Sequence, residues 1–169
     1  MTDPAVSPEL IQHRVALGPL NRWWPVAASW MVNDEPCGLT RLGEKIVIWR
    51  DKEGSVHCVE DRCPHRGARL SMGWNIGDRI ACWYHGLEMG GDGVVRDVPA
   101  MADCPMIGQK MIRAYPCFQH LGGIFVWLGD ELHQEPDEFV FPEAFVSDAW
   151  TAIMCTAHWS CNRVAAVDN

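Results

Sequence analysis

The chain has 169 residues, a hydrophobic content of 48% and a formal net charge of −8 at pH 7. Its length suits one domain, or one domain and part of another, and its apolar content is enough for a packed core. The acidic balance argues against a nucleic-acid or anionic-membrane partner, which would favour a basic patch. No apolar run approaches the roughly 18 residues of a spanning helix, and residues 1–10 lack the features of a signal peptide. We therefore expect a cytoplasmic protein.

The N-terminal residues predict a helix. Ser7 is followed by Pro8 and Glu9, and this order of N-cap, first-turn proline and acid is typical of a helix start. We expect the helix to run to about Leu17 and to end at Gly18.

After this helix, short apolar runs predict strands. Turn residues separate the runs at 51–54, 90–93 and 121–123. Strands of this length at short intervals predict a mainly β fold, a small antiparallel β-sandwich or barrel. The expected strands are residues 24–29, 45–50, 55–60, 79–85, 93–98, 110–119 and 123–129.

The last part of the chain differs in composition. Residues 130–138 are acidic and contain a proline, which is typical of a linker. Residues 149–161 predict a further strand, and residues 162–169 resemble the first turns of a helix without a cap or a terminating glycine. We expect three segments: an N-terminal helical segment at 1–21, a β domain at 22–137 and the truncated beginning of an α+β domain at 138–169.

Two short Cys–His pairs carry the chemistry. Cys63 and His65 are two residues apart, Cys82 and His85 are three apart, and sixteen residues lie between the pairs. A glycine soon follows each pair. One buried cysteine would mean little, because free cysteine is often part of a core. Two mixed Cys–His pairs of this kind indicate a functional site.

The mixing of residue types favours an iron–sulfur cluster over zinc. The eight cysteines lie below the share expected of a disulfide scaffold, roughly 8–10%, and in a reducing compartment Cys with His indicates metal. Structural zinc sites usually pair Cys with Cys and His with His. In a Rieske [2Fe–2S] centre two thiolates hold one iron and two imidazoles hold the other. The sequence therefore predicts a [2Fe–2S] cluster on Cys63, His65, Cys82 and His85.

These motifs resemble a known family. Cys-Pro-His-Arg-Gly and Cys-Trp-Tyr-His-Gly are similar to the two cluster-binding motifs of Rieske non-haem iron oxygenases, the aromatic ring-hydroxylating oxygenase α subunits. The resemblance runs from about Arg22 to Asn169. The segments that carry it are 22–29, 63–67, 82–86, 91–100, 112–130 and 161–169.

Some positions depart from the family pattern. Leu87 stands where an aromatic residue is usual, and Arg163 stands where tryptophan is usual. Neither is a cluster ligand. The Rieske proteins of respiratory complexes are less similar, because Ala68 and Tyr84 occupy the positions of their additional disulfide.

The resemblance implies an oxygenase with two iron centres. An NAD(P)H-dependent reductase, sometimes with a ferredoxin, would supply electrons to the cluster and onward to a mononuclear Fe(II). That iron would activate O₂ for mono- or dioxygenation of an aromatic substrate or for O-demethylation, in a homotrimer or an α3β3 assembly. Asp168 and Asn169 match the opening of the catalytic motif, so the iron ligands would follow Asn169 and no catalytic residue is expected in this chain.

The alternative is a stand-alone Rieske ferredoxin, an electron carrier that is not an enzyme. The N-terminal helix and the segment after the linker exceed what a carrier needs, and they favour the oxygenase subunit.

Other candidates receive weaker interpretations. Strand alternation predicts that Cys58 lies in the core and that His57 is exposed. Trp74 and Trp83 are expected to shield the cluster from water, and Arg66 is placed to complement its charge.

Three further residues look metal-like by composition. On a strand His158 would face away from Cys155 and Cys161, so these three are expected to be structural. Arg69 has either a surface role or the same role as Arg66.

Overall fold

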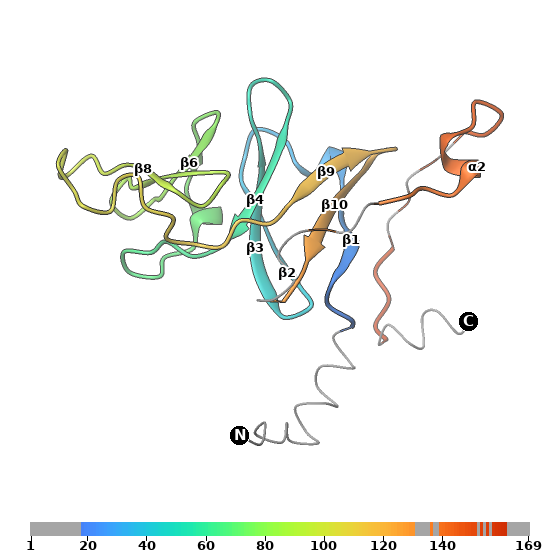
Figure 1. Ribbon diagram of the computed structural model, residues 1–169, viewed down its shortest axis with the longest axis horizontal. Helices are drawn as coiled ribbons and strands as arrows, with labels where there is room; N and C mark the ends of the chain where they lie inside the picture. The colour runs from blue at the N-terminus through green and yellow to red at the C-terminus, as the bar shows by residue number, and fades with distance from the viewer. Residues whose placement is uncertain are drawn as a thin grey trace, which may run out of the picture.

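Residues 18–130 of the chain form three antiparallel sheets (Figure 1). The computed structural model describes residues 18–130, 136, 139–151, 153, 155 and 157–161. Sheet A has the strand order β1-β10-β9, sheet B has β2-β3-β4 and sheet C has β5-β6-β7-β8. In Figure 1 sheet C lies at one end, α2 lies at the other, and sheets B and A lie between them. The elements are β1 Arg22–Ala28, η1 Ser29–Met31, β2 Cys37–Arg41, β3 Glu44–Arg50, β4 Val56–Glu60, η2 Leu70–Met72, β5 Trp74–Asn75, β6 Arg79–Ala81, β7 Glu88–Gly90, β8 Val95–Asp97, β9 Cys117–His120, β10 Gly123–Leu128 and α2 Glu143–Val146.

Sheet B separates two hydrophobic cores. Strand β3 has four consecutive buried residues, and successive side chains of a strand leave opposite faces. Val47 and Trp49 therefore enter one core, whereas Ile46 and Ile48 enter the other. Each such side chain contributes about 1.5–3 kcal/mol when fully buried.

We name the two cores by their buried residues. The first core consists of Val47, Trp49, Val59, Cys63, Leu70, Ile80, Cys82, Leu87, Met89, Val95 and Ile112. The second core consists of Val26, Val32, Ile46, Ile48, Cys58, Tyr115, Ile124, Val126 and Leu128.

The expected turns are present where backbone chemistry requires them. The N–H of Gly54 donates to the carbonyl of Asp51 at 3.1 Å and closes the turn between β3 and β4. Gly93, between β7 and β8, has φ +79°, and a Cβ there would lie 2.2 Å from the carbonyl oxygen of Ile112. Only glycine fits this position, because any side chain would collide with backbone.

The prediction of a mainly antiparallel β fold is confirmed, but the described residues form open sheets and no closed barrel. The strand expected at 79–85 ends at Ala81, because the chain then enters a turn. The strand expected at 110–119 is present only from Cys117. Short β2 and β7 were not predicted, because their glycines and charged residues hide the apolar alternation, and β5 was not predicted because it has only two residues.

The N-terminal helix expected at 7–17 lies outside the described residues, as do residues 162–169. The strand expected at 149–161 is wrong for the described part of that segment, which carries no strand. A strand requires hydrogen bonds to a neighbouring strand, and Trp150 and Ile153 remain 70% and 81% exposed.

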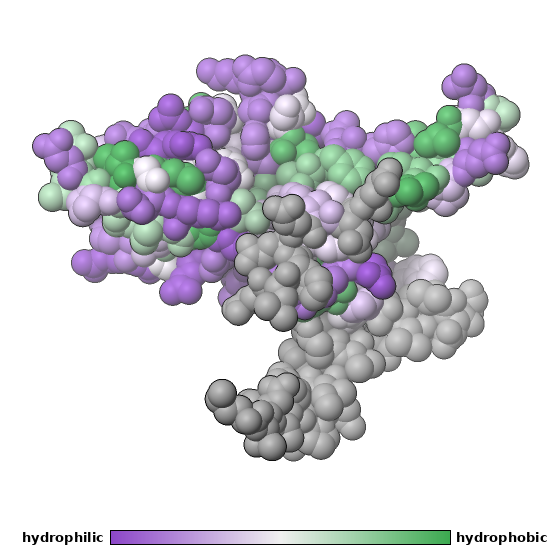
Figure 2. Space-filling view, viewed as in Figure 1, coloured by the Kyte–Doolittle hydropathy of each residue, from purple (hydrophilic) through white to green (hydrophobic). Residues whose placement is uncertain are grey.

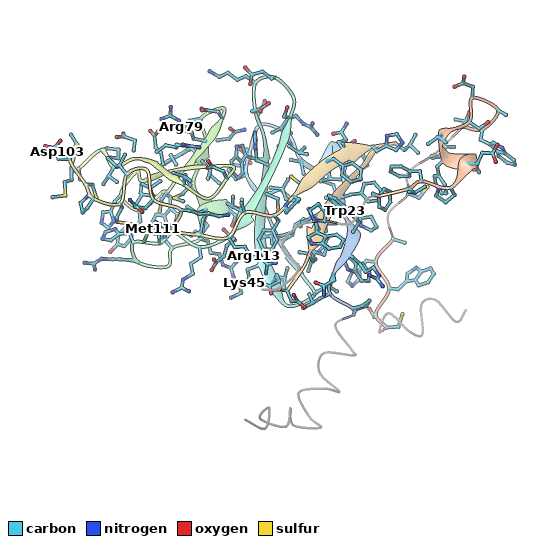
Figure 3. The ribbon with its side chains drawn as sticks, viewed as in Figure 1. Trp23, Lys45, Arg79, Asp103, Met111 and Arg113 are labelled. Atoms are coloured by element: carbon cyan, nitrogen blue, oxygen red, sulfur yellow. The ribbon has the colours of Figure 1, made fainter. Side chains whose placement is uncertain are left out.

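Residues after the expected linker pack against sheet A. Trp23, Phe118 and Phe125 of sheet A form an aromatic cluster with Phe139 and Phe141. The ring centroids of Phe125 and Phe139 are 5.3 Å apart, and those of Trp23 and Phe118 are 4.8 Å apart. Figure 3 labels Trp23 among these rings. Figure 2 shows apolar areas both at the sheet C end and beside the segment that leads to α2.

Candidate metal centre

The first Cys–His pair lies on a tight loop after β4. The N–H of Gly67 donates to the carbonyl of Cys63 at 2.8 Å, and the N–H of Cys63 donates to the carbonyl of Ala68 at 2.8 Å. Gly67 has φ +71°, in the left-handed region that favours glycine. The loop buries the Cys63 side chain and exposes His65.

The second pair repeats this geometry between β6 and β7. The N–H of Gly86 donates to the carbonyl of Cys82 at 2.8 Å, the N–H of Cys82 donates to the carbonyl of Leu87 at 2.8 Å, and Gly86 has φ +73°. Cys82 is buried and His85 is exposed. Two five-residue segments that place His at different positions therefore form the same backbone turn.

The two loops face each other. The ring centroids of His65 and His85 are 4.9 Å apart. The thiols of Cys63 and Cys82 are within hydrogen-bonding reach of each other. The fold therefore brings together all four residues predicted from the sequence, with sulfur on the buried side and imidazole on the exposed side.

The sulfur of Cys63 has a mixed environment. Burial raises the pKa of the Cys63 thiol to about 11, and the neighbouring Cys82 acts in the same direction. The backbone N–H groups of His65 and Arg66 donate to this sulfur and act in the opposite direction. A bound metal would replace the proton, since metals bind the thiolate form. The N–H donors are already placed for that form.

The donor set fits a binuclear cluster. The two thiols lie next to each other, and so do the two imidazoles. This arrangement is the one expected when both cysteines bind one iron and both histidines bind the other. Within the part of the chain that the structure describes, no three His, Cys, Asp or Glu side chains gather around a single ion position.

Comparison with known proteins identifies the domain. Residues 22–116 match the family described as the Rieske [2Fe-2S] domain. The chain belongs to this family. The [2Fe-2S] cofactor predicted from the mixed Cys–His pairs is that of the Rieske family.

Relatives of this Rieske domain include oxygenase components. The vanillate O-demethylase oxygenase subunit of Pseudomonas sp. (strain HR199 / DSM 7063) is 34% identical over 151 residues, which are 89% of this chain and 42% of that protein. The terminal oxygenase of carbazole 1,9a-dioxygenase from Novosphingobium sp. KA1 superposes with a TM-score of 0.70 at 33% identity, covering 81% of this chain and 38% of that one. A reduced complex between oxygenase and ferredoxin in carbazole 1,9a-dioxygenase gives a TM-score of 0.67 at 34% identity, covering 79% of this chain and 35% of that one.

The chain spans less than half the length of those proteins. Among its described residues, none of the helices has the length and apolar character needed to cross a membrane.

The residues expected around the cluster are exposed in this Rieske domain. Trp74 is 58% exposed and Trp83 is 44% exposed, so in this chain neither is packed as a full shield. Trp83 stacks on Tyr84, which in turn stacks on His85 with ring centroids 3.9 Å apart. Arg66 is part of the first loop and is exposed.

The prediction for Cys58 is confirmed and that for His57 is wrong. Cys58 is 1% exposed in the second core. His57 is only half-exposed, because its Nε2 pairs with Oδ2 of Asp51 at 2.8 Å and its ring lies 5.2 Å from that of Trp49. Hydrogen bonding to His57 lowers the pKa of Asp51.

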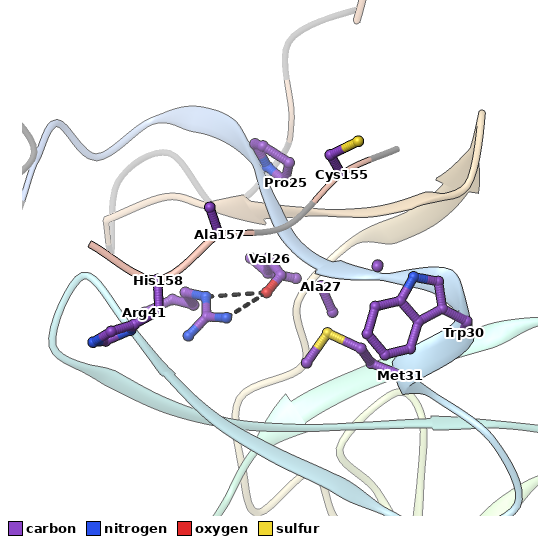
Figure 4. Close-up of a pocket in the computed structure, with 10 residues that line it drawn as sticks. Pro25, Val26, Ala27, Trp30, Met31, Arg41, Cys155, Ala157 and His158 are labelled. Atoms are coloured by element: carbon purple, nitrogen blue, oxygen red, sulfur yellow. Dashed lines mark hydrogen bonds between the residues drawn. The ribbon is translucent and has the colours of Figure 1, made fainter. Parts of the chain in front are cut away.

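Cys155, His158 and Cys161 lie apart from the two Cys–His pairs. Cys155 and His158 line a pocket of about 560 Å³ with Arg41, whose guanidinium donates twice to the carbonyl of Val26 (Figure 4). None of the four paired Cys and His residues lines this pocket. Cys161 is exposed.

Sequence reasoning missed Asp61 and Ser71. Asp61 is the one buried charged residue among those described, at 7% exposure. Its Oδ1 accepts from the N–H of Ser71 at 2.7 Å, and its Oδ2 accepts from the Ser71 hydroxyl at 2.7 Å. An acid two residues before the first ligand pair is the available signal, but without structure it is one acid among 22.

Proposed function

We propose that Cys63, His65, Cys82 and His85 bind the [2Fe–2S] cluster of this Rieske domain. The two cysteines would hold one iron and the two histidines would hold the other. Three features support this assignment: the matching turns, the 4.9 Å separation of the imidazole rings and the contact between the thiols. The convergence of these four side chains from two separate loops is the observation that carries the proposal.

The cluster supplies reversible uptake of single electrons. The residues of the chain set the conditions for this chemistry. The first core excludes water from the two sulfurs, since Cys63 and Cys82 are 2% and 1% exposed. The N–H groups of His65 and Arg66 stabilise negative charge at the Cys63 sulfur. The exposed imidazoles are the natural side for electron entry and exit, because the sulfur side is covered by protein.

The chain acts, in this proposal, as the electron-transfer domain of an oxygenase α subunit. Segment 1–21 is an N-terminal helical segment, 22–137 is the Rieske domain and 138–169 begins a catalytic domain with a mononuclear Fe(II). The relatives named above are themselves oxygenase components. An aromatic compound and O₂ are the proposed substrates, with mono- or dioxygenation or O-demethylation as the reaction.

The proposed electron donors are an NAD(P)H-dependent reductase and, where one is used, a ferredoxin. The complex of a related oxygenase with ferredoxin supports the second of these. The proposed assembly is a homotrimer or α3β3, and the proposed location is the cytoplasm.

The alternative is a Rieske ferredoxin that only carries electrons. The packing of Phe139 and Phe141 on sheet A favours the oxygenase subunit, because chain beyond the Rieske match is integrated into the structure. The relatives favour it as well.

The cofactor test uses the whole 169-residue chain, purified or reconstituted without oxygen. We expect about two irons and two inorganic sulfides per chain, and a rhombic EPR signal of low average g after reduction. One zinc per chain, without visible absorption, would overturn the ligand assignment.

The activity test is a single turnover with a panel of aromatic acids and ethers. The chain is reduced and exposed to O₂, and products are measured. We expect reoxidation without product, because the proposed iron ligands follow Asn169. A longer chain that includes the catalytic domain is expected to form hydroxylated or demethylated product. Reoxidation of that longer chain without any product would favour the electron carrier.

A further inference from the structure

The two ligand loops have the same turn but different supports. The second loop is the tip of a hairpin, since Ala81 and Glu88 on either side of it are paired in the β6–β7 ladder. Arg79 Nη1 and Glu88 Oε2 form an ion pair at 2.9 Å across the same ladder. Sheet C therefore holds both ends of the second loop.

The first loop leaves sheet B at Glu60 and enters η2 at Leu70, so no hairpin joins its two ends. The contact that joins them is the one between Asp61 and Ser71. Both carboxylate oxygens of Asp61 accept from Ser71, each at 2.7 Å. The backbone N–H of Asp61 donates to the carbonyl of Lys45 at 2.9 Å, which ties this pair to β3.

The surroundings show that the fold makes room for this contact. A Cβ at Gly38 of β2 would lie 2.6 Å from both Cβ and Oγ of Ser71, and 3.4 Å from Oδ2 of Asp61. Leu70, beside Ser71, is fully buried in the first core together with Cys63. A buried carboxylate is costly unless its oxygens are hydrogen-bonded, so both oxygens hold Ser71 firmly.

We propose that Asp61 is a positioning residue, and that its two hydrogen bonds to Ser71 close the base of the first ligand loop and fix Cys63 and His65 opposite Cys82 and His85. The inference rests on the proposed ligand set. Asp61 does for the first loop what the β6–β7 ladder does for the second. Side chains replace a backbone ladder because the two ends of the first loop are not neighbouring strands.

The test compares Asp61→Ala, Asp61→Asn and Ser71→Ala in the whole chain loaded with iron and sulfide. Loss of cluster absorbance to an iron chelator is measured together with the spread of g values in the EPR spectrum. We expect Asp61→Ala to lose its cluster at least ~10-fold faster than the unmodified chain, because hydrogen bonds to a charged group are strong, and to give broader EPR lines. Asp61→Asn keeps an acceptor for the Ser71 N–H and is expected to remain within about threefold of the unmodified chain.

A matched control separates positioning from general loss of stability. Ile124 is fully buried in the second core, away from both loops. Ile124→Val or Ile124→Ala, whichever matches the thermal midpoint of the Asp61 variant, is expected to leave the g values unchanged. If Asp61→Ala does not fold, Ser71→Ala removes only the hydroxyl and should give an intermediate rate.

The outcomes are distinguishable. An unmodified chain that binds no [2Fe–2S] cluster overturns the ligand assignment itself. A normal cluster in the unmodified chain, with rates and g values in Asp61→Ala and Ser71→Ala equal to those of the stability-matched control, overturns the role of Asp61.

Discussion

The two cores lie on opposite faces of sheet B, and both contain buried cysteines. In the first core Cys63 and Cys82 lie on loops, where glycine turns and backbone N–H groups surround the sulfur. In the second core Cys58 lies on β4, and Cys117 on β9 packs against it. The Cys117 thiol donates to the carbonyl of Val56 at 3.3 Å, so its nearest backbone partner is an acceptor.

Buried cysteines of the two cores therefore differ in the backbone groups that surround the sulfur. A strand directs its N–H groups into the sheet ladder, so they are not free to donate to a sulfur on that strand. A tight loop frees its N–H groups, which then point at the sulfur and favour its anionic form. On the proposed ligand assignment, the first core uses its sulfurs to bind the cluster, whereas the second core uses sulfur to fill space.

The largest expected difference is in cofactor content. Replacing Cys63 or Cys82 with Ala should abolish the cluster, because one iron loses half of its protein ligands. Cys58→Ala should keep about two irons and two sulfides per chain. Iron and sulfide assays with visible absorption measure both. A full iron content in Cys63→Ala would contradict the proposal that the cysteines of the first core bind the cluster.

The next effect is on reduction potential. We expect the potential of the unmodified chain to lie in the lower part of the roughly −150 to +300 mV Rieske range, because the chain is acidic and Ala68 and Tyr84 replace the additional disulfide of the respiratory proteins. His65→Cys should retain a cluster and move its potential towards the about −400 mV of all-cysteine [2Fe–2S] sites, since thiolate adds negative charge. His120→Cys, at the sheet A side, is the control and should leave the potential unchanged. Voltammetry of the protein on an electrode measures both, and equal shifts would argue against His65 as a ligand.

A matched pair of core variants sharpens the comparison. Ile48 and Ile80 are both fully buried. Ile48 lies in the second core, whereas Ile80 lies in the first core, two residues before Cys82. Replacing either with Ala should lower the free energy of unfolding by about 2–5 kcal/mol. Only Ile80→Ala should also broaden the EPR signal. Denaturant unfolding and EPR test this, and a broadened signal in Ile48→Ala would mean that sheet B does not insulate the cores.

The smallest effect is the dependence of stability on alkaline pH. Burial raises the pKa of Cys117 to about 12 and that of Cys58 well above its usual 9. The folded state therefore holds these protons more tightly than the unfolded chain does. Their stabilising contribution is complete below pH 9 and is lost as the pH rises from 9 towards 12, by up to about 1.4 kcal/mol per pH unit for each thiol.

The double variant Cys58→Ala/Cys117→Ala should show a shallower loss of stability above pH 9. Tyr115 in the same core also has a pKa raised by burial and supplies a residual slope above pH 10. Thermal midpoints measured from pH 7 to 11 test this, and an identical slope in the double variant would show that the thiols do not contribute.

The amino-acid sequence by itself predicted the chemistry of the site. The mixed Cys–His pairs and the glycines that follow them identify the four candidate ligands, because residue type and spacing within a short loop are local properties. The main strands of sheets A and B were also predictable, since β3 and β10 are long apolar runs with turn residues at their ends. The alternation in β4 placed Cys58 in the core correctly.

Only the tertiary structure decided how these parts fit together. The approach of the two loops, the hydrogen bonds from Ser71 to Asp61 and the half-burial of His57 all depend on contacts that local sequence patterns do not show. The strand expected at 79–85 ends at Ala81 because the hydrogen bond from Cys82 to Leu87 turns the chain, although Trp83 and Tyr84 suit a strand. Local propensity sets what a segment is able to form. The hydrogen bonds and burial that other segments offer determine which of those forms is stable.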